Sequence, residues 1–192
     1  SMVTDITGNG FVYAMADLGN SSEVWRYAYR DMGKSSDIAC SVTLNTAIDS
    51  STFNTTAPYQ GAGIIMKDVE TGGIIAWVLE GRPFGAGSAT EDNYAILSVQ
   101  KWTNESTFLS NHLSARIKVS GPVSLLAHRR DSLTDFKYSL TGVDYVSFTT
   151  IDHVSTGTPY INTNRLGFGY YNKSGTTDRG QENAASFGWV DL

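Results

Sequence analysis

Carboxylates are the first residues to consider, because two of them on either side of a glycosidic bond can hydrolyse it. A single strand can supply such a pair at alternate positions, since these share one face. The spacing E-x-D-x-x-E is absent. The nearest acidic pairs, Asp68 with Glu70 and Glu91 with Asp92, fall in turn-like segments. The sequence therefore predicts a non-enzymatic protein, with a hydrolase built on displaced carboxylates as the alternative.

Other catalytic and metal chemistries find little support. The three histidines are scattered, no Gly-x-Ser-x-Gly elbow exposes a serine, and zinc spacings such as H-E-x-x-H are missing. Cys40 alternates with apolar residues and is predicted to be a core thiol rather than a nucleophile. We expect no cofactor. Calcium would be the one ion to test, because it accepts isolated loop carboxylates. The loop acids that could ligate it are Asp49, Asp92, Asp152 and Asp178.

Binding a sugar needs less, namely an aromatic face and side chains that pair with hydroxyl groups. Alternation places Gln100 and Trp102 on one face of a strand that we expect to be solvated. Glu80 and Arg82 come at the end of a neighbouring strand, and His128 and Arg130 share one face of strand 124–130. All four side chains carry polar groups that can pair with sugar hydroxyls. The predicted carbohydrate-binding residues are Glu80, Arg82, Gln100, Trp102, His128 and Arg130.

The composition excludes other partners. The chain has 192 residues, of which 41% are apolar and only 17% charged, with a net charge of −5. Arg129-Arg130 is the only basic dipeptide, whereas nucleic-acid binding calls for a basic stripe with interleaved aromatics. No run of 18 apolar residues occurs. We expect neither a nucleic-acid nor a membrane partner.

Period-2 alternation bounded by Gly, Pro, Asn, Asp or Ser recurs along the chain and predicts an all-β fold. The expected strands are 11–16, 23–29, 37–46, 60–67, 74–80, 94–102, 114–119, 124–130, 136–140, 145–151, 165–172 and 184–190. Strands 60–67 and 74–80 are apolar on both faces, so we expect something to cover their second face.

The connections add detail. The segments 69–73 and Gly121-Pro122 have turn-forming residues, and both are predicted to join antiparallel neighbours. A short helix is expected over 106–113, where Asn104 could cap it. Such strands pack as a two-sheet antiparallel β-sandwich.

The domain prediction is a single β-sandwich over residues 3–192, because neither a repeat nor a linker interrupts the pattern. Residues 1–2, Ser-Met, are typical of a tag remnant. Four Asn-x-Ser/Thr sequons occur, a number close to chance in a chain this rich in Ser and Thr, and they leave a secreted lectin as a further alternative. They lie at Asn20, Asn54, Asn104 and Asn172.

Several segments together resemble a known family. The stretches 61–68, 70–75 and 99–103, followed by 126–131, 136–145, 165–169 and 185–190, resemble in order and hydrophobic pattern the concanavalin A-like lectin/glucanase sandwich module of tailed-bacteriophage virion proteins. The match spans about residues 59–192. It departs at Thr141, where Asp is usual, and at Tyr145, where Trp is usual.

That resemblance implies a jelly roll of two curved antiparallel sheets in a phage tail or virion, outside the cell, with a role either in binding host-surface carbohydrate or in virion structure. The expected partners are a host-surface polysaccharide and other virion proteins, with a homo-oligomer as an open alternative. The resemblance names no ligand, because one fold hosts many functions.

Overall fold

The computed structural model describes residues 24–31, 37–45, 60–81, 94–153, 163–172 and 184–190. Several predictions fall outside these ranges, namely strand 11–16, Arg82 and three of the four loop acids, Asp49, Asp92 and Asp178.

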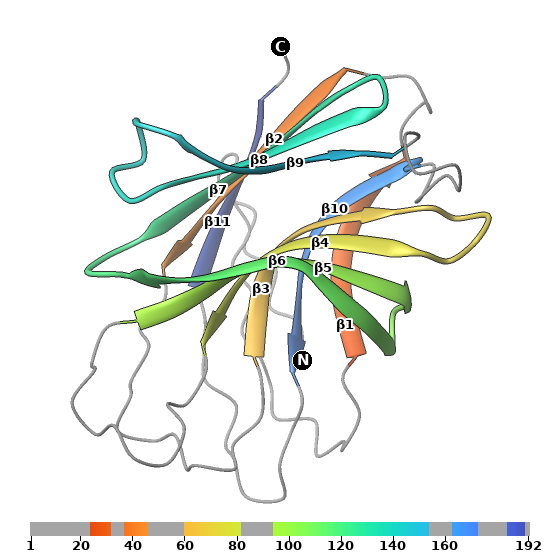
Figure 1. Cartoon of the computed structure of the whole chain (residues 1–192), viewed down its shortest axis with the longest axis horizontal. Coiled ribbons are helices and arrows are strands. Elements are labelled where there is room, and N and C mark those ends of the chain that lie inside the picture. The colour runs from red at the N-terminus through yellow and green to blue at the C-terminus, as the bar shows by residue number, and fades with distance from the viewer. Residues whose placement is uncertain are drawn as a thin grey trace, which may run out of the picture.

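The described strands form two sheets, each antiparallel throughout (Figure 1). The six-stranded sheet has the order β1 (Val24–Asp31), β10 (Arg165–Asn172), β3 (Gln60–Lys67), β4 (Ile74–Gly81), β5 (Tyr94–Asn104) and β6 (Thr107–Lys118). The five-stranded sheet has the order β11 (Ala184–Val190), β2 (Ile38–Asn45), β7 (Val123–Arg130), β8 (Leu133–Ser139) and β9 (Val146–Asp152). The predicted all-β sandwich of jelly-roll type is confirmed.

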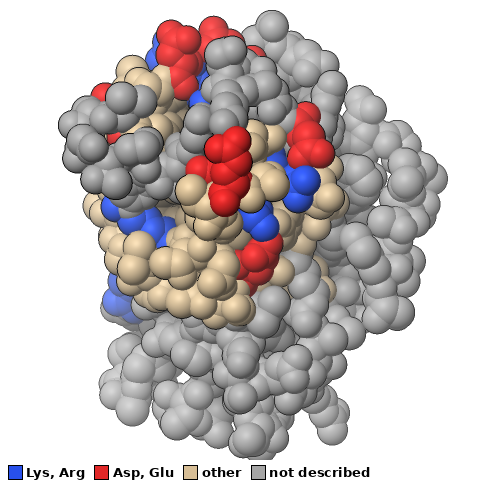
Figure 2. All heavy atoms as spheres, turned by 90° about the vertical axis from the view of Figure 1, so that its right-hand side faces the viewer, with Lys and Arg blue, Asp and Glu red and all other residues tan. Residues whose placement is uncertain are grey.

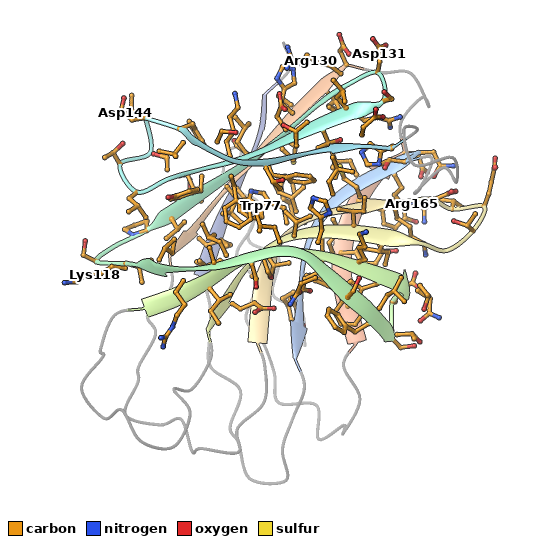
Figure 3. All side chains as sticks on the ribbon, viewed as in Figure 1. Trp77, Lys118, Arg130, Asp131, Asp144 and Arg165 are labelled. Atoms are coloured by element: carbon orange, nitrogen blue, oxygen red, sulfur yellow. The ribbon has the colours of Figure 1, made fainter. Side chains whose placement is uncertain are left out.

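The main core lies between the two sheets, and Trp77 of β4 stands at its centre (Figure 3). Its ring packs against Phe136 and Phe148, with centroids 5.9 and 4.7 Å away, and its indole N–H donates to the carbonyl oxygen of Lys137 at 3.1 Å. This bond satisfies the one polar atom of a fully buried side chain. Cys40 also lies in this core, where burial raises the pKa of its thiol, so the predicted core thiol is confirmed.

The predicted turn at 69–73 joins β3 to β4 as antiparallel neighbours, as expected. Asp68 organises it, because its carboxylate accepts the backbone N–H of Glu70 at 2.9 Å. Gly72 has φ 81° and closes the turn with a hydrogen bond to the Asp68 carbonyl. A residue without Cβ is needed at this φ.

Two connection predictions are wrong. Residues 106–113 form no helix, because all but Ser106 belong to strand β6. Gly121-Pro122 links β6 to β7, which lie in different sheets rather than pairing with each other. Gly121-Pro122 does form a connection between two strands. Whether such a connection stays within one sheet or passes to the other depends on which faces the two strands bury, and the turn residues do not determine this.

Two glycines allow strands of the six-stranded sheet to approach closely. A Cβ on Gly63 would overlap the carbonyl oxygen of Trp77, and a Cβ on Gly167 would overlap that of Ala28. Gly63 lies in β3 and Gly167 in β10. Strand β10 pairs with β1 on one side and with β3 on the other. Backbone can therefore pack where no side chain fits.

Candidate functional site

The six-stranded sheet curls so far that its first and fifth strands meet across its outer face, the face turned away from the other sheet. Strands β10, β3 and β4 separate β1 from β5. Nevertheless, the backbone N–H of Trp25 donates to the carbonyl oxygen of Glu105, in the β5–β6 turn, at 2.8 Å. Figure 1 shows the end of the β5–β6 hairpin near the start of β1. We call this turn, residues 104–106, the strap.

The strap covers a second, smaller core on the outer face. Its buried members are Trp25, Ile65, Ile74, Ala76, Val78 and Trp102. Trp102 stands edge-on to Trp25 at 5.9 Å and to Phe108 at 5.3 Å. The cover expected over the apolar second face of β3 and β4 is thus supplied, in part, by the protein's own aromatic residues.

Three of the predicted sugar-binding residues come together here, but they are buried. Trp102 donates its indole N–H to the side-chain oxygen of Gln100 at 3.0 Å, and the Gln100 amide in turn donates to Glu80. All three are at most 3% exposed. The expectation that the Gln100 and Trp102 face is solvated is therefore wrong, because β1 and the strap cover it.

Ser98 extends this buried polar group. It lies two residues before Gln100 on the same face of β5, is fully buried, and its hydroxyl has no hydrogen-bond partner. A buried unpartnered hydroxyl is uncommon. The hydrogen-bonded chain from Trp102 to Glu80 orients the Gln100 amide and stabilises the outer-face core.

The exposed part of the outer face lies at the other end of β1. Tyr29 is 51% exposed, and the guanidinium of Arg165 lies over its ring at 3.7 Å. Asp31 accepts a hydrogen bond from Arg165 at 2.7 Å. Tyr27 lies two residues before Tyr29 on the same face, with ring centroids 5.9 Å apart. Figure 3 places Arg165 on the right-hand side of the molecule.

The strap adds polar groups beside these aromatics. Glu105 accepts hydrogen bonds from the Tyr27 hydroxyl, at 3.1 Å, and from the Lys67 ammonium. We name this set of side chains the β1 patch: Tyr27, Tyr29, Asp31, Lys67, Glu105 and Arg165. Figure 2 shows acidic and basic side chains next to one another on this side of the molecule.

The ion pairs of the β1 patch fix its charges. Burial opposes the charge on Lys67, but hydrogen bonds to Glu105 and Tyr27 outweigh it and raise the pKa of Lys67. Burial likewise works against the Glu105 carboxylate, yet the bond from Lys67 lowers the pKa of Glu105. The hydrogen bond to Asp31 raises the pKa of Arg165. Lys67, Glu105 and Arg165 are therefore charged at neutral pH.

The sequence reasoning overlooked the β1 patch, although part of its signal was present. Trp25, Tyr27 and Tyr29 alternate along a predicted strand, which places three aromatic rings on one face. Arg165 and Lys67 become neighbours only through the pairing of β1 with β10 and of β10 with β3. These pairings join strands that lie more than 90 residues apart in the sequence, which local patterns do not predict.

The remaining predicted residues, His128 and Arg130, lie on the outer face of the five-stranded sheet. Arg130 donates to Asp135 at 2.7 Å, and Thr150 donates to the same carboxylate at 2.6 Å. The bond from Thr150, helped by Arg130, lowers the pKa of Asp135 against the effect of burial. Glu80, Gln100 and Trp102 belong to the other sheet, so these three lie apart from His128 and Arg130.

The histidines do not gather into a catalytic group among the described residues. His153 is buried, and its Nε2 lies 2.8 Å from the Thr134 hydroxyl. Burial, together with the nearby Arg129, lowers the pKa of His153 to about 4. Its Nδ1 has no hydrogen-bond partner. His153 is therefore neutral at pH 7 and part of the interior.

The described ranges lack two features, a cluster of metal ligands and a membrane-spanning helix. Within these ranges, no three His, Cys, Asp or Glu side chains gather as ligands for a metal ion. The same ranges hold no helix long and apolar enough to cross a membrane.

Comparison with known proteins defines the chain by fold alone. No protein-family model matches it, and no curated protein matches it significantly. Solved structures do match, at low sequence identity. One is a functionally unknown protein from Saccharomyces cerevisiae, with a TM-score of 0.58, 11% identity, and coverage of 98% of this chain and 90% of that one.

Two other similar structures carry functional descriptions of their own. The CBM2 module of the evolved Dit of Lactobacillus casei phage J-1 has a TM-score of 0.52 and 9% identity, covering 88% of this chain and 70% of that one. The GH43 BlXynB protein of Bacillus licheniformis has a TM-score of 0.50 and 16% identity, covering 94% of this chain but 32% of that one.

Proposed function

We propose that this chain is a non-enzymatic β-sandwich module of a phage tail or related virion that binds a carbohydrate on the host surface. The β1 patch carries the proposal. It offers a half-exposed tyrosine ring beside donors and acceptors already held in place by two ion pairs. A pyranose ring can pack against the exposed part of the Tyr29 ring that Arg165 leaves uncovered, while its hydroxyls bond to Asp31 and Arg165.

The structural similarity to a phage CBM2 module supports the virion setting. The order of segments in the sequence, which resembles phage sandwich modules, supports the same setting. A tail-associated module acts outside the cell, where bacterial surface glycans are accessible ligands.

The arrangement of Glu80 supports a binding role over a hydrolytic one. This carboxylate is fully buried and engaged by the Gln100 amide. A hydrolase needs two carboxylates that reach the scissile bond. On this proposal Glu80, Gln100 and Trp102 stabilise the outer face that presents the β1 patch.

A screen of the purified chain against bacterial surface polysaccharides tests the proposal. We expect saturable binding to at least one of them and loss of that binding in Tyr29→Ala. Absence of saturable binding to every polysaccharide would refute the carbohydrate role. New reducing ends that disappear in Glu80→Gln would refute the non-enzymatic part and favour the hydrolase.

The outer face of the five-stranded sheet is the competing surface in this screen. His128 and Arg130 lie there with Asp135, on the opposite side of the sandwich. A double variant, His128→Ala with Arg130→Ala, is expected to bind as the wild type does. If this variant loses binding while Tyr29→Ala keeps it, the site lies on that sheet instead.

A further inference from the structure

The strap bounds the β1 patch on one side. From Tyr29 the outer face runs along β1 toward Tyr27 and then Trp25. At Tyr27 it meets Glu105, whose carboxylate accepts bonds from Tyr27 and Lys67 and whose carbonyl accepts the Trp25 N–H. Beyond this point the floor is closed, since Trp25 and Trp102 are each 3% exposed.

This closure limits how much of a sugar chain the patch can contact. A long polysaccharide that lies along a sheet face needs a continuous floor of exposed side chains. Along β1 the described residues of this face are exposed at Tyr29 and Asp31, and the strap stands across the path from them to Trp25; exposed side chains elsewhere on this sheet, such as Phe108, belong to β6. A saccharide seated on Tyr29 that extends toward Trp25 therefore meets the strap after about one or two units.

The charges of the β1 patch select among saccharides. Its two cations, Arg165 and Lys67, are each paired with a carboxylate, Asp31 and Glu105 respectively. The Asp31 side chain is 68% exposed and that of Glu105 38% exposed. A ligand carboxylate or phosphate would meet these negative charges and no uncompensated cation within the patch. Neutral hydroxyls can use both the acceptors and the donors.

We infer that the β1 patch recognises the terminal one or two units of a neutral saccharide, rather than the interior of a long or anionic chain. This inference rests on the proposed carbohydrate-binding function. It names the ligand class of that site and the part of the chain that is contacted.

The test uses fragments of whichever polysaccharide the intact protein binds, cut by partial acid hydrolysis and separated into lengths of one to six units. Calorimetric titration with each length measures the affinity. We expect the affinity to level off at two units, changing by less than about threefold from there to six. A rise of about tenfold or more beyond three units would overturn the inference and leave the proposed function standing.

Charge is tested by a matched pair of variants. Asp31→Asn removes the carboxylate that neutralises Arg165, whereas Asp144→Asn removes an exposed carboxylate on a distant turn. We expect Asp31→Asn to weaken binding of the neutral fragment and to create measurable binding of oligogalacturonides, which the wild type and Asp144→Asn lack. Binding of oligogalacturonides by the wild type would overturn the inference. Failure of every polysaccharide to bind would instead overturn the proposed function.

Discussion

The backbone N–H of Trp25 donates a hydrogen bond of 2.8 Å to the carbonyl oxygen of Glu105. This bond joins the first strand of the six-stranded sheet to a turn that follows the fifth strand, across the outer face. It helps to cover a small core on this face, while Tyr29, at the other end of β1, stays exposed. The position of the exposed patch follows from this closure.

The Glu105 side chain should contribute measurably to closing the strap. Glu105→Gln leaves Lys67, whose side chain is 13% exposed, with a neutral partner. We expect a loss of about 1 kcal/mol in the free energy of unfolding, as for a partly exposed pair. Urea unfolding measures it, and Asp144→Asn serves as the charge-matched control. Equal stability of the two variants would show that the ion pair is not needed.

Trp102 and Tyr29 should separate stability from binding. Trp102→Ala removes a buried ring that packs on Trp25 and Phe108, and we expect it to cost about 3–5 kcal/mol in urea unfolding. Tyr29→Ala removes an exposed ring and should cost less than about 1 kcal/mol. A stable Trp102→Ala variant that had merely lost glycan binding would restore the role that the sequence suggested for Trp102.

The backbones of β3 and β4 approach so closely at Gly63 that adding one methyl group there should destabilise the fold strongly. In Gly63→Ala the new Cβ overlaps the Trp77 carbonyl, so strands β3 and β4 must move apart. We expect a loss of about 3 kcal/mol or more. The control is Gly121→Ala, where nothing lies within 4 Å of the added atom, and its melting temperature should stay at the wild-type value. A Gly63→Ala variant as stable as this control would contradict the observed strand spacing.

His153 should make the protein sensitive to mild acid. Its pKa is about 4 in the folded chain, against 6.5 for an ordinary histidine. Protonation therefore favours the unfolded state, so this contribution is intact above pH 6.5 and is lost as the pH falls toward 4. The loss approaches about 3 kcal/mol. In His153→Gln the free energy of unfolding should fall less steeply over this interval, and parallel curves for the two proteins would contradict the prediction.

Local patterning predicted most of the strands. The bounds 60–67, 165–172 and 184–190 agree with β3, β10 and β11, because alternation and flanking turn residues act over short distances. Strand β6 was missed in part because its pairing with β5 is irregular. His112 and Leu109 have no partner in the register, so Phe108, Leu109 and Leu113 lose the alternation that marks a strand.

The candidate site was harder to predict for a different reason. Alternation correctly placed Gln100 and Trp102 on one face, but it does not say what covers that face. The cover comes from Trp25 of β1 and from the strap, which meet only after the sheet has curled. Exposure of Tyr29 and pairing of Arg165 with Asp31 depend equally on that long-range closure.

An NMR titration of the isotope-labelled chain with the bound saccharide fragment shows where on the sandwich the glycan binds. We predict saturable shifts in the backbone amides of Tyr27, Tyr29 and Arg165, with His128 and Arg130 unchanged. Saturable shifts confined to His128 and Arg130, or an unperturbed Tyr29 at saturation, would contradict binding at the β1 patch.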